Sequence, residues 1–441
     1  MKKLFILAVL ALTFAVTAGY TAQPSGGKAV NISFEQLLSQ LKTGGASDVN
    51  VPAPASELVA LEDLKGDDRY WVTVLASDKK ARTALLEIGL DIAEVKSRTV
   101  SGFVHAPELA ALSQSGYVVQ SRETIYDYAK KYFKDFPAAD SAYHNYKETT
   151  ELLVQLATAN SDLVSLFSIG KTVEGRDIWC LRLNASDKGE APSLKPGALF
   201  MGNHHAREHL SNEVALLYAV YLLERKSDPE IKKYLDSLDI YIIPMLNADG
   251  VEFDIASGKY RWQRKNMRVN ANKSIGVDLN RNYDSLWCQA GASHSPSAET
   301  YCGPSAFSEP ETQAVKKFVE ARRNIRTLMS YHSYSALLLY PWAGKDIPLE
   351  NEKDRRVFEI MAQKMTEFTG YKPEQSSDLY VATGDTTDWA YSTAGIFAFT
   401  TELEGNGFYP GPGVIDHAVS TNIKAALYLL SVTDNPYKLL K

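Results

Sequence analysis

The sequence has no basic block, no glycine-rich phosphate loop and no long apolar run beyond its first residues. Net charge is −6 over 441 residues, so nucleic acid and anionic membranes are poor partner candidates. The missing apolar run argues against stable membrane association. The missing phosphate loop leaves no sign of a nucleotide site of the P-loop or dinucleotide type.

What is present indicates a globular, exported protein. Hydrophobic residues make up 45% and charged residues 23% of the chain, a globular composition, and the length exceeds one ordinary compact domain. Lys2 and Lys3 precede an apolar run, 4–16, which is followed by small residues. This order predicts a signal peptide over 1–22 and a secreted product, with an uncleaved anchor as the alternative.

The three cysteines are Cys180, Cys288 and Cys302. Export permits a disulfide, and we expect it between Cys288 and Cys302, which share a polar loop rich in Ser and Gly. Cys180 lies in the alternating run 177–183, so we expect a buried strand thiol. A nucleophilic role stays open, although no base is nearby in the sequence.

The chain divides into segments of different pattern. We expect a poorly structured leader over 23–67 and a connecting helix with an activation segment over 121–142. Between them, 68–120 predicts the order strand, helix, strand, strand, helix, strand. That order is typical of a small α+β ferredoxin-like sandwich.

The segment 143–441 alternates helical patterns with apolar strands. This alternation predicts an α/β domain whose mixed, largely parallel sheet is covered by helices on both faces. The expected strands are 198–201, 240–244, 327–331 and 397–402. The expected helices include 212–224, 309–322 and 355–369.

Polar residues follow two of these strands. His205 and Glu208 come after the first and His332 after the third, at the sheet edge where α/β folds hold ligands. Two histidines and a carboxylate leave one zinc position open, which is the catalytic arrangement. His-x-x-Glu alone is weak, His204 or His209 could compete as ligands, and a lone His332 is more often a core residue.

With these residues, the chain resembles the zinc carboxypeptidases of the A/B type, most closely the secreted bacterial carboxypeptidase T branch. His205-Ala206-Arg207-Glu208 and His332-Ser333-Tyr334 resemble the two zinc motifs of that family. Further matching stretches, in the same order and spacing, are 261–265, 277–282, 303–312, Tyr380 and 399–403. Chance would have to produce each separated match independently.

The resemblance implies a role for each matching residue. It implies one zinc ion per chain, held by His205, Glu208 and His332, with Asp278 orienting the first histidine. It implies Glu402 as general base and acid and Arg264 as the partner of the developing oxyanion. The implied substrate contacts are Arg207 along the cleft and Asn280, Arg281 and Tyr380 around the terminal carboxylate.

The side-chain pocket is less defined. The resemblance places Thr387 at the pocket floor, with Ala343 and Thr400 as a roomy wall, and Asp385 could meet a basic side chain. We therefore expect release of hydrophobic and basic C-terminal residues. Asp385 as an exposed turn residue is the alternative.

Regulation and competing functions complete the expectations. The 68–120 unit has the topology of the inhibitory prosegment in this family, so a zymogen is expected, with a permanent accessory domain as the alternative. The partners would be peptide and protein C-termini, and the default state is a monomer. A cell-wall peptide hydrolase and a catalytically dead binding module are the competing functions. Structural calcium stays open.

Overall fold

The computed structural model describes residues 66–132, 140–256 and 260–441. The expected signal peptide, and the expected leader up to residue 65, lie outside the described residues. In the described part of the chain, no helix combines the length and apolar character needed to cross a membrane.

The N-terminal part forms a four-stranded antiparallel sheet in the order β2-β3-β1-β4. Its elements are β1 (Arg69–Leu75), α4 (Lys79–Ile88), β2 (Asp91–Val95), β3 (Thr99–His105), α5 (Ala106–Gln114) and β4 (Val119–Thr124), followed by α6 (Ile125–Tyr132). Asp78 caps α4 by accepting from the Ala81 amide, and Gly89 ends it in a left-handed conformation. Val72, Leu85 and their neighbours form its apolar core.

The larger part is built on an eight-stranded mixed sheet in the order β11-β10-β12-β9-β7-β8-β6-β5. The central pairs β12–β9, β9–β7 and β7–β8 are parallel. The strands are β5 (Val164–Lys171), β6 (Asp177–Leu183), β7 (Gly197–Met201), β8 (Asp239–Ile243), β9 (Ile325–Ser333), β10 (Leu337–Tyr340), β11 (Lys372–Gln375) and β12 (Phe397–Leu403).

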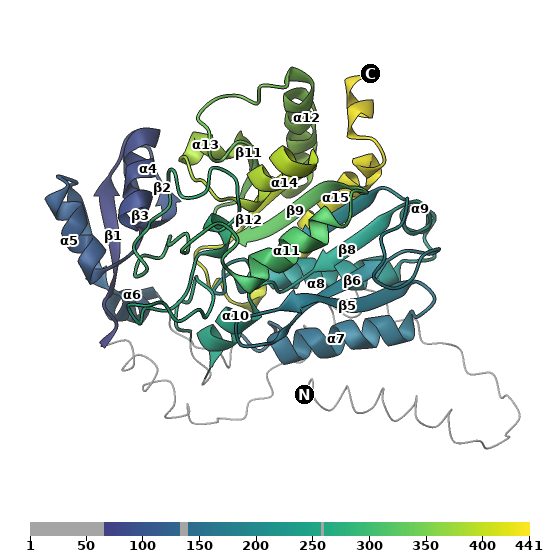
Figure 1. Ribbon diagram of the computed structural model, residues 1–441, viewed down its shortest axis with the longest axis horizontal. Coiled ribbons are helices and arrows are strands. Elements are labelled where there is room, and N and C mark those ends of the chain that lie inside the picture. Colours follow the sequence, from purple (N-terminus) through teal and green to yellow (C-terminus); the bar gives the residue numbers. More distant parts are fainter. Residues whose placement is uncertain (1–65, 133–139, 257–259) are drawn as a thin grey trace, which may run out of the picture. The chain divides into compact units, whose positions relative to one another are not determined.

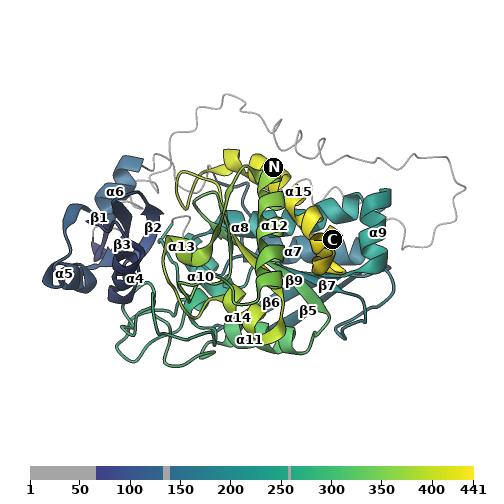
Figure 2. The same cartoon turned by 90° about the horizontal axis from the view of Figure 1, so that it is seen from above.

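Helices cover both faces of this sheet (Figures 1 and 2). On one face α8 (His209–Glu224) and α15 (Ile415–Thr433) pack on the central strands, with α7 (Tyr146–Ala159) beside α8. On the other, α11 (Pro310–Glu320) and α14 (Thr386–Ala394) enclose a core that includes Cys180 and Tyr241. The remaining helices are α9 (Pro229–Ser237), α10 (Ala248–Ile255), α12 (Glu352–Thr369), α13 (Ser376–Leu379) and the short η2 (Leu279–Arg281), η3 (Pro412–Val414) and η4 (Pro436–Leu440).

The expected fold class is confirmed. The four buried strands β7, β8, β9 and β12 lie where the apolar runs predict them. Two cysteine expectations also hold, because Cys288 and Cys302 form a disulfide and Cys180 is a buried free thiol in β6.

Candidate active site

A sharp turn between β7 and α8 brings the first polar residues to the sheet edge. Gly202 is required there, because a Cβ atom would lie 2.5 Å from the Pro244 carbonyl oxygen. Asn203 adopts a left-handed conformation with φ 51°, which asparagine tolerates. Its amide nitrogen donates to the carbonyl oxygens of His205 and Glu208 at 3.2 and 3.1 Å. The Asn203 side chain therefore stabilises the turn, and the turn directs the side chains of His205 and Glu208 at one point.

Donor atoms of three side chains converge at that point. Glu208 Oε1 lies 2.7 Å from His205 Nδ1, and its Oε2 lies 3.0 Å from His332 Nδ1. The two Nδ1 atoms are 3.2 Å apart, and all three side chains are buried. Among the described residues they form one of two clusters that could hold a metal ion.

The geometry of this cluster fits zinc. Ligands of a tetrahedral zinc ion at roughly 2.0–2.1 Å lie roughly 3.3 Å from one another, close to the separations of the three donor atoms. His205 Nε2 lies 3.1 Å from Asp278 Oδ1, and a carboxylate accepts that proton. The proton therefore sits on Nε2, which leaves the lone pair of Nδ1 directed at Glu208 and His332.

The other histidines of this region are engaged elsewhere. The ring of His204 stacks on His332 with centroids 5.3 Å apart, and burial lowers its pKa well below the usual value. His209 Nε2 pairs with Asp254 Oδ2 at 2.9 Å. Neither places a nitrogen in the cluster, which contains His205 and not His204 or His209.

A cavity of about 460 Å³ opens over the cluster. Its lining residues that the sequence had singled out are His205, Glu208, Arg264, Asn280, Arg281, His332, Tyr380 and Glu402. Glu402 pairs with His332 across the parallel strands β12 and β9, so the sheet register sets it beside the cluster. Burial raises the pKa of Glu402 to about 7, as does the negative charge of Glu208, while His332 opposes the shift.

Two arginines border the cavity with different partners. Arg264 donates Nε and Nη2 to Asp278 Oδ2 at 3.0 and 2.9 Å, so Asp278 orients both this guanidinium and His205. Arg281 donates Nε to the Gly291 carbonyl at 3.0 Å and Nη1 to the Asn280 carbonyl at 2.8 Å. A guanidinium has five donor hydrogens, so further donors of Arg281 remain for an anion.

The expected pocket residues take other positions. Ala343, Asp385, Thr387 and Thr400 are buried, and none of them lines the cavity. Asp385 is the N-cap of α14: its Oδ1 accepts from the amides of Thr387 and Asp388. The exposed turn residue considered as the alternative is not what the structure shows.

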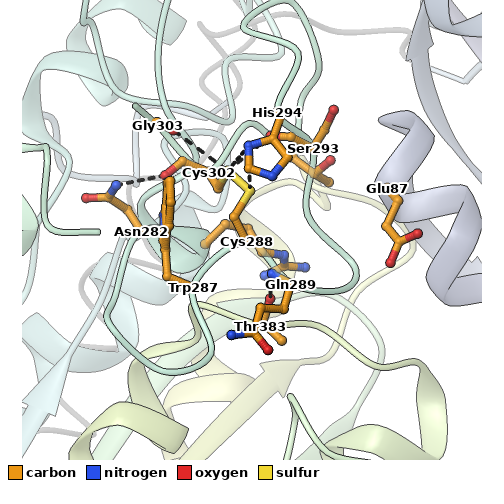
Figure 3. Close-up of a disulfide and its surroundings, with 12 residues drawn as sticks. Glu87, Asn282, Trp287, Cys288, Gln289, Ser293, His294, Cys302, Gly303 and Thr383 are labelled. Atoms are coloured by element: carbon orange, nitrogen blue, oxygen red, sulfur yellow. Dashed lines mark hydrogen bonds between the residues drawn. A yellow bond between two sulfur atoms is a disulfide. The ribbon is translucent and has the colours of Figure 1, made fainter. Parts of the chain in front are cut away.

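The second possible metal cluster consists of Cys288, His294 and Cys302. Figure 3 shows the disulfide between the two cysteines, with the His294 ring beside it. The sulfurs are thus committed to each other, and His294 Nδ1 lies 3.5 Å from Cys288 Sγ.

Sequence reasoning missed one group of residues in the cavity. Residues 91–96, from β2 and the turn after it, line it together with Leu86. Asp91 forms an ion pair with Arg207, and its Oδ1 lies 3.3 Å from Arg264 Nη1. Phe408 also lines the cavity, and the guanidinium of Arg207 lies 4.0 Å from its ring centroid. No sequence pattern marks Asp91, because a strand residue facing a distant partner leaves no local signal.

Comparisons with known proteins point in one direction. The profile of the family described as zinc carboxypeptidase matches residues 149–425. A zinc carboxypeptidase of Saccharothrix mutabilis subsp. capreolus is 34% identical over 397 residues, covering 84% of this chain and 90% of that protein. Carboxypeptidase A6 of Homo sapiens is 35% identical over 277 residues, covering 60% of this chain and 61% of that protein.

Solved structures agree on the fold. The crystal structure of carboxypeptidase A from Helicoverpa armigera superposes with a TM-score of 0.70 at 23% identity, covering 83% of this chain and 98% of that one. The resemblance that the motifs indicated is confirmed. The chain belongs to the zinc carboxypeptidase family.

Proposed function

We propose that this chain is an exported carboxypeptidase precursor whose catalytic part removes single residues from peptide C-termini. The observation that carries the proposal is one shared cavity. It contains the His205, Glu208 and His332 cluster, the buried acid Glu402, and the anion-binding pair Asn280 and Arg281. A metal-dependent carboxypeptidase needs these three elements together: a metal site, a proton carrier and a group that binds the terminal carboxylate.

His205, Glu208 and His332 would hold zinc, with Asp278 fixing the His205 tautomer. Bound zinc lowers the pKa of a coordinated water to roughly 7 and polarises the scissile carbonyl. Glu402, buried beside the cluster with its pKa raised by burial, would take a proton from the attacking water and return it to the leaving amine. Arg264 lies beside the cluster and supplies fixed positive charge for the developing oxyanion.

Arg281 explains why the chain would act at ends. Its planar fork of donors fits a carboxylate, and an internal peptide bond has no carboxylate to place there. Tyr380 lies on the same cavity wall. Burial raises the pKa of its hydroxyl, which keeps it a neutral hydrogen-bond donor at neutral pH.

For side-chain preference we propose hydrophobic residues first and basic residues second. Thr387, Ala343 and Thr400 are small and buried but do not line the cavity, so this preference is carried by the family resemblance of their positions. Asp385 gives the region one negative charge, but its oxygens already accept from Asn280, Thr387 and Asp388. Rates with matched peptides ending in Phe, Leu, Arg and Glu test this, and fast release of Glu with slow release of the others would overturn it.

We propose further that the N-terminal unit inhibits the enzyme until it is cut away. Asp91 engages Arg207 and Arg264, the residues proposed to contact substrate and oxyanion. Arg69 donates to the Trp262 carbonyl at 2.8 Å, and His105 Nε2 lies 3.0 Å from Glu299 Oε1. Of these contacts, the Asp91 carboxylate is the one that places an anion against the cavity arginines, while Arg69 and His105 fasten the N-terminal unit beside it.

The proposed cut lies within 120–142. Arg122 is exposed there, whereas Lys134 lies outside the described residues and nothing is described of the side chains of Lys130 and Lys131. Export fits both the disulfide, which persists in oxidising compartments, and the signal-like sequence over 1–22. Comparing purified full-length and trimmed protein tests the zymogen, and equal activity in both would reject it.

The central experiment compares wild-type protein with Glu402→Gln on a short chromogenic peptide, with and without a chelator. Loss of the proton carrier should lower kcat by about 100- to 10,000-fold at unchanged zinc content. Glu404→Gln, two residues further on and outside the cavity lining, is the matched control. Full activity in Glu402→Gln, or with zinc removed, would refute the proposal. A muropeptide substrate run beside the peptide tests the cell-wall alternative.

A further inference from the structure

Behind Asn280 runs a buried row of hydrogen bonds that the proposed chemistry does not use. Asn280 Nδ2 donates to Asp385 Oδ2 at 3.2 Å, and Asn280 Oδ1 accepts from the Thr386 hydroxyl at 2.7 Å. Thr386 Oγ1 lies 3.0 Å from His204 Nε2, and His204 Nδ1 lies 3.2 Å from Ser330 Oγ. All five side chains are at least nine-tenths buried.

The donors and acceptors of this row have only one consistent order. The backbone N–H of Thr386 points at Asn280 Oδ1 at 3.0 Å and can only donate, so the oxygen of the amide must face Thr386. The Thr386 hydroxyl donates its one proton to the same oxygen, so its own oxygen must accept a hydrogen bond from His204. His204 therefore carries its proton on Nε2, and its Nδ1 accepts from the Ser330 hydroxyl. The Tyr283 hydroxyl, 3.0 Å from Nε2, shares that proton.

This order decides which end of Asn280 a ligand meets. The amide oxygen is held inward by two donors, and the nitrogen uses one hydrogen on Asp385. The second hydrogen of Nδ2 remains for a partner in the cavity that Asn280 lines. A flipped amide would instead bring its oxygen to the other side, where a carboxylate would be repelled.

We propose that Thr386 and His204 are positioning residues that lock Asn280 as a hydrogen-bond donor to the substrate's terminal carboxylate. The inference rests on the proposed function, because it needs a carboxylate beside Asn280. His204 also stacks on His332, so it touches both the metal cluster and the row. The Thr386 hydroxyl bonds to Asn280 and His204 and not to the metal cluster, so the two residues can be separated by experiment.

Thr386→Val removes the hydroxyl while keeping a β-branched side chain of similar size. We expect KM for a peptide substrate to rise about three- to tenfold, the value of one net hydrogen bond, with kcat and zinc content unchanged. Binding of 3-phenylpropanoate, a carboxylate probe without a peptide bond, should weaken by the same factor in calorimetry. Thr386→Ser, which keeps the hydroxyl, should restore both values.

Thr433→Val is the matched control. Thr433 is buried and shares a hydrogen bond of 2.7 Å with Thr327, away from the cavity, so it loses the same atoms with the same effect on packing. His204→Phe is a second variant that keeps a ring on His332 but cannot donate, and it should reproduce the rise in KM.

Unchanged KM and probe affinity in Thr386→Val would overturn the proposal, as would an equal effect in Thr433→Val. Should Thr386→Val not fold, the same two values in His204→Phe decide the question. Wild-type protein that binds the probe but cleaves no C-terminal peptide would instead refute the proposed function and leave the positioning role standing.

Discussion

At the scale of single residues, Asp278 is the position where two groups of the site depend on one side chain. Its Oδ1 accepts from His205 Nε2 and its Oδ2 accepts from Arg264. Asp278→Asn keeps the shape and removes the charge. We expect zinc affinity to fall about 10- to 100-fold, as is usual when a carboxylate behind a ligating histidine is lost.

Competition with a fluorescent chelator measures this change directly, without reliance on turnover. Asp284→Asn, at an exposed position of the same segment, serves as control and should bind zinc as the wild type does. A zinc affinity in Asp278→Asn equal to that of the control would mean that His205 needs no partner to be oriented.

The same residues show how much of the candidate site could be predicted from the sequence. Motif resemblance named His205, Glu208, His332 and Glu402, and the fold places all four at one cavity, because strand ends in a parallel sheet converge at one edge. The sequence does not distinguish the neighbouring histidines, because His204 and His205 differ in the face of the turn from which their rings project.

At the scale of elements, the loop closed by the disulfide supports Arg281, the arginine proposed to bind the terminal carboxylate. The Cys288–Cys302 bond spans 14 residues, and within that loop the Gly291 carbonyl accepts from Arg281 Nε at 3.0 Å. The loop also contacts Thr383, through the amides of Gln289 and Ala290 (Figure 3). Disulfide and arginine are therefore parts of one unit.

Cys288→Ala combined with Cys302→Ala tests that unit. Opening a loop of this length should lower the free energy of unfolding by about 2–4 kcal/mol and raise KM more than it lowers kcat, because Arg281 loses a fixed support. Denaturant unfolding and steady-state kinetics measure the two effects. Reductant should lower stability and raise KM in the wild-type protein in the same way and change neither value in the double variant. A destabilised double variant with normal KM would show that Arg281 does not depend on the loop.

Some strands of the sheet can be predicted from local sequence and others cannot. β8 reads Asp239–Ile243 and is buried throughout, so its apolar run predicts a strand from local composition alone. β11, Lys372–Gln375, holds a lysine, a proline and two further polar residues, and among the described strands it pairs with β10 alone, at the sheet edge. Its conformation comes from the neighbouring strand, which no local pattern encodes.

At the scale of the whole molecule, Asp91 connects the N-terminal sheet to the cavity. Replacing it by Asn leaves Arg207 and Arg264 without their ion-pair partner from β2. The ratio of uncut to cut activity should therefore be about tenfold or more higher in this variant than in the wild type. The ratio of uncut to cut activity on one peptide measures this. Asp127→Asn, on the exposed side of α6, should leave the ratio unchanged, and an unchanged ratio in Asp91→Asn would show that Asp91 does not hold the inhibited state.

A second contact between the same two parts should make the proposed inhibition depend on pH. Burial lowers the pKa of His105, but its hydrogen bonds to Asp68 and Glu299 outweigh burial and raise it to about 9. The positive charge of Arg69 lowers the pKa of His105, and the positive charge of Lys265 also acts on Glu299, whose pKa it lowers. Asp68 lies in the same N-terminal part and stays beside His105 on undocking, whereas the Glu299 contact exists only in the docked form. Protonated His105 therefore stabilises docking through Glu299 at pH values below the pKa of the undocked form. That stabilisation is lost as pH rises through 9.

The activity of the uncut chain, divided by that of the cut chain at each pH, should therefore rise between pH 6.5 and 9. His105→Gln can accept or donate a hydrogen bond but cannot carry the charge, so its ratio should start higher and stay flat over the same range. Dividing by the cut form removes the titration of Glu402, which both forms share. A rising ratio that persists in His105→Gln would place the pH dependence in another group of the interface and exclude His105 as its source.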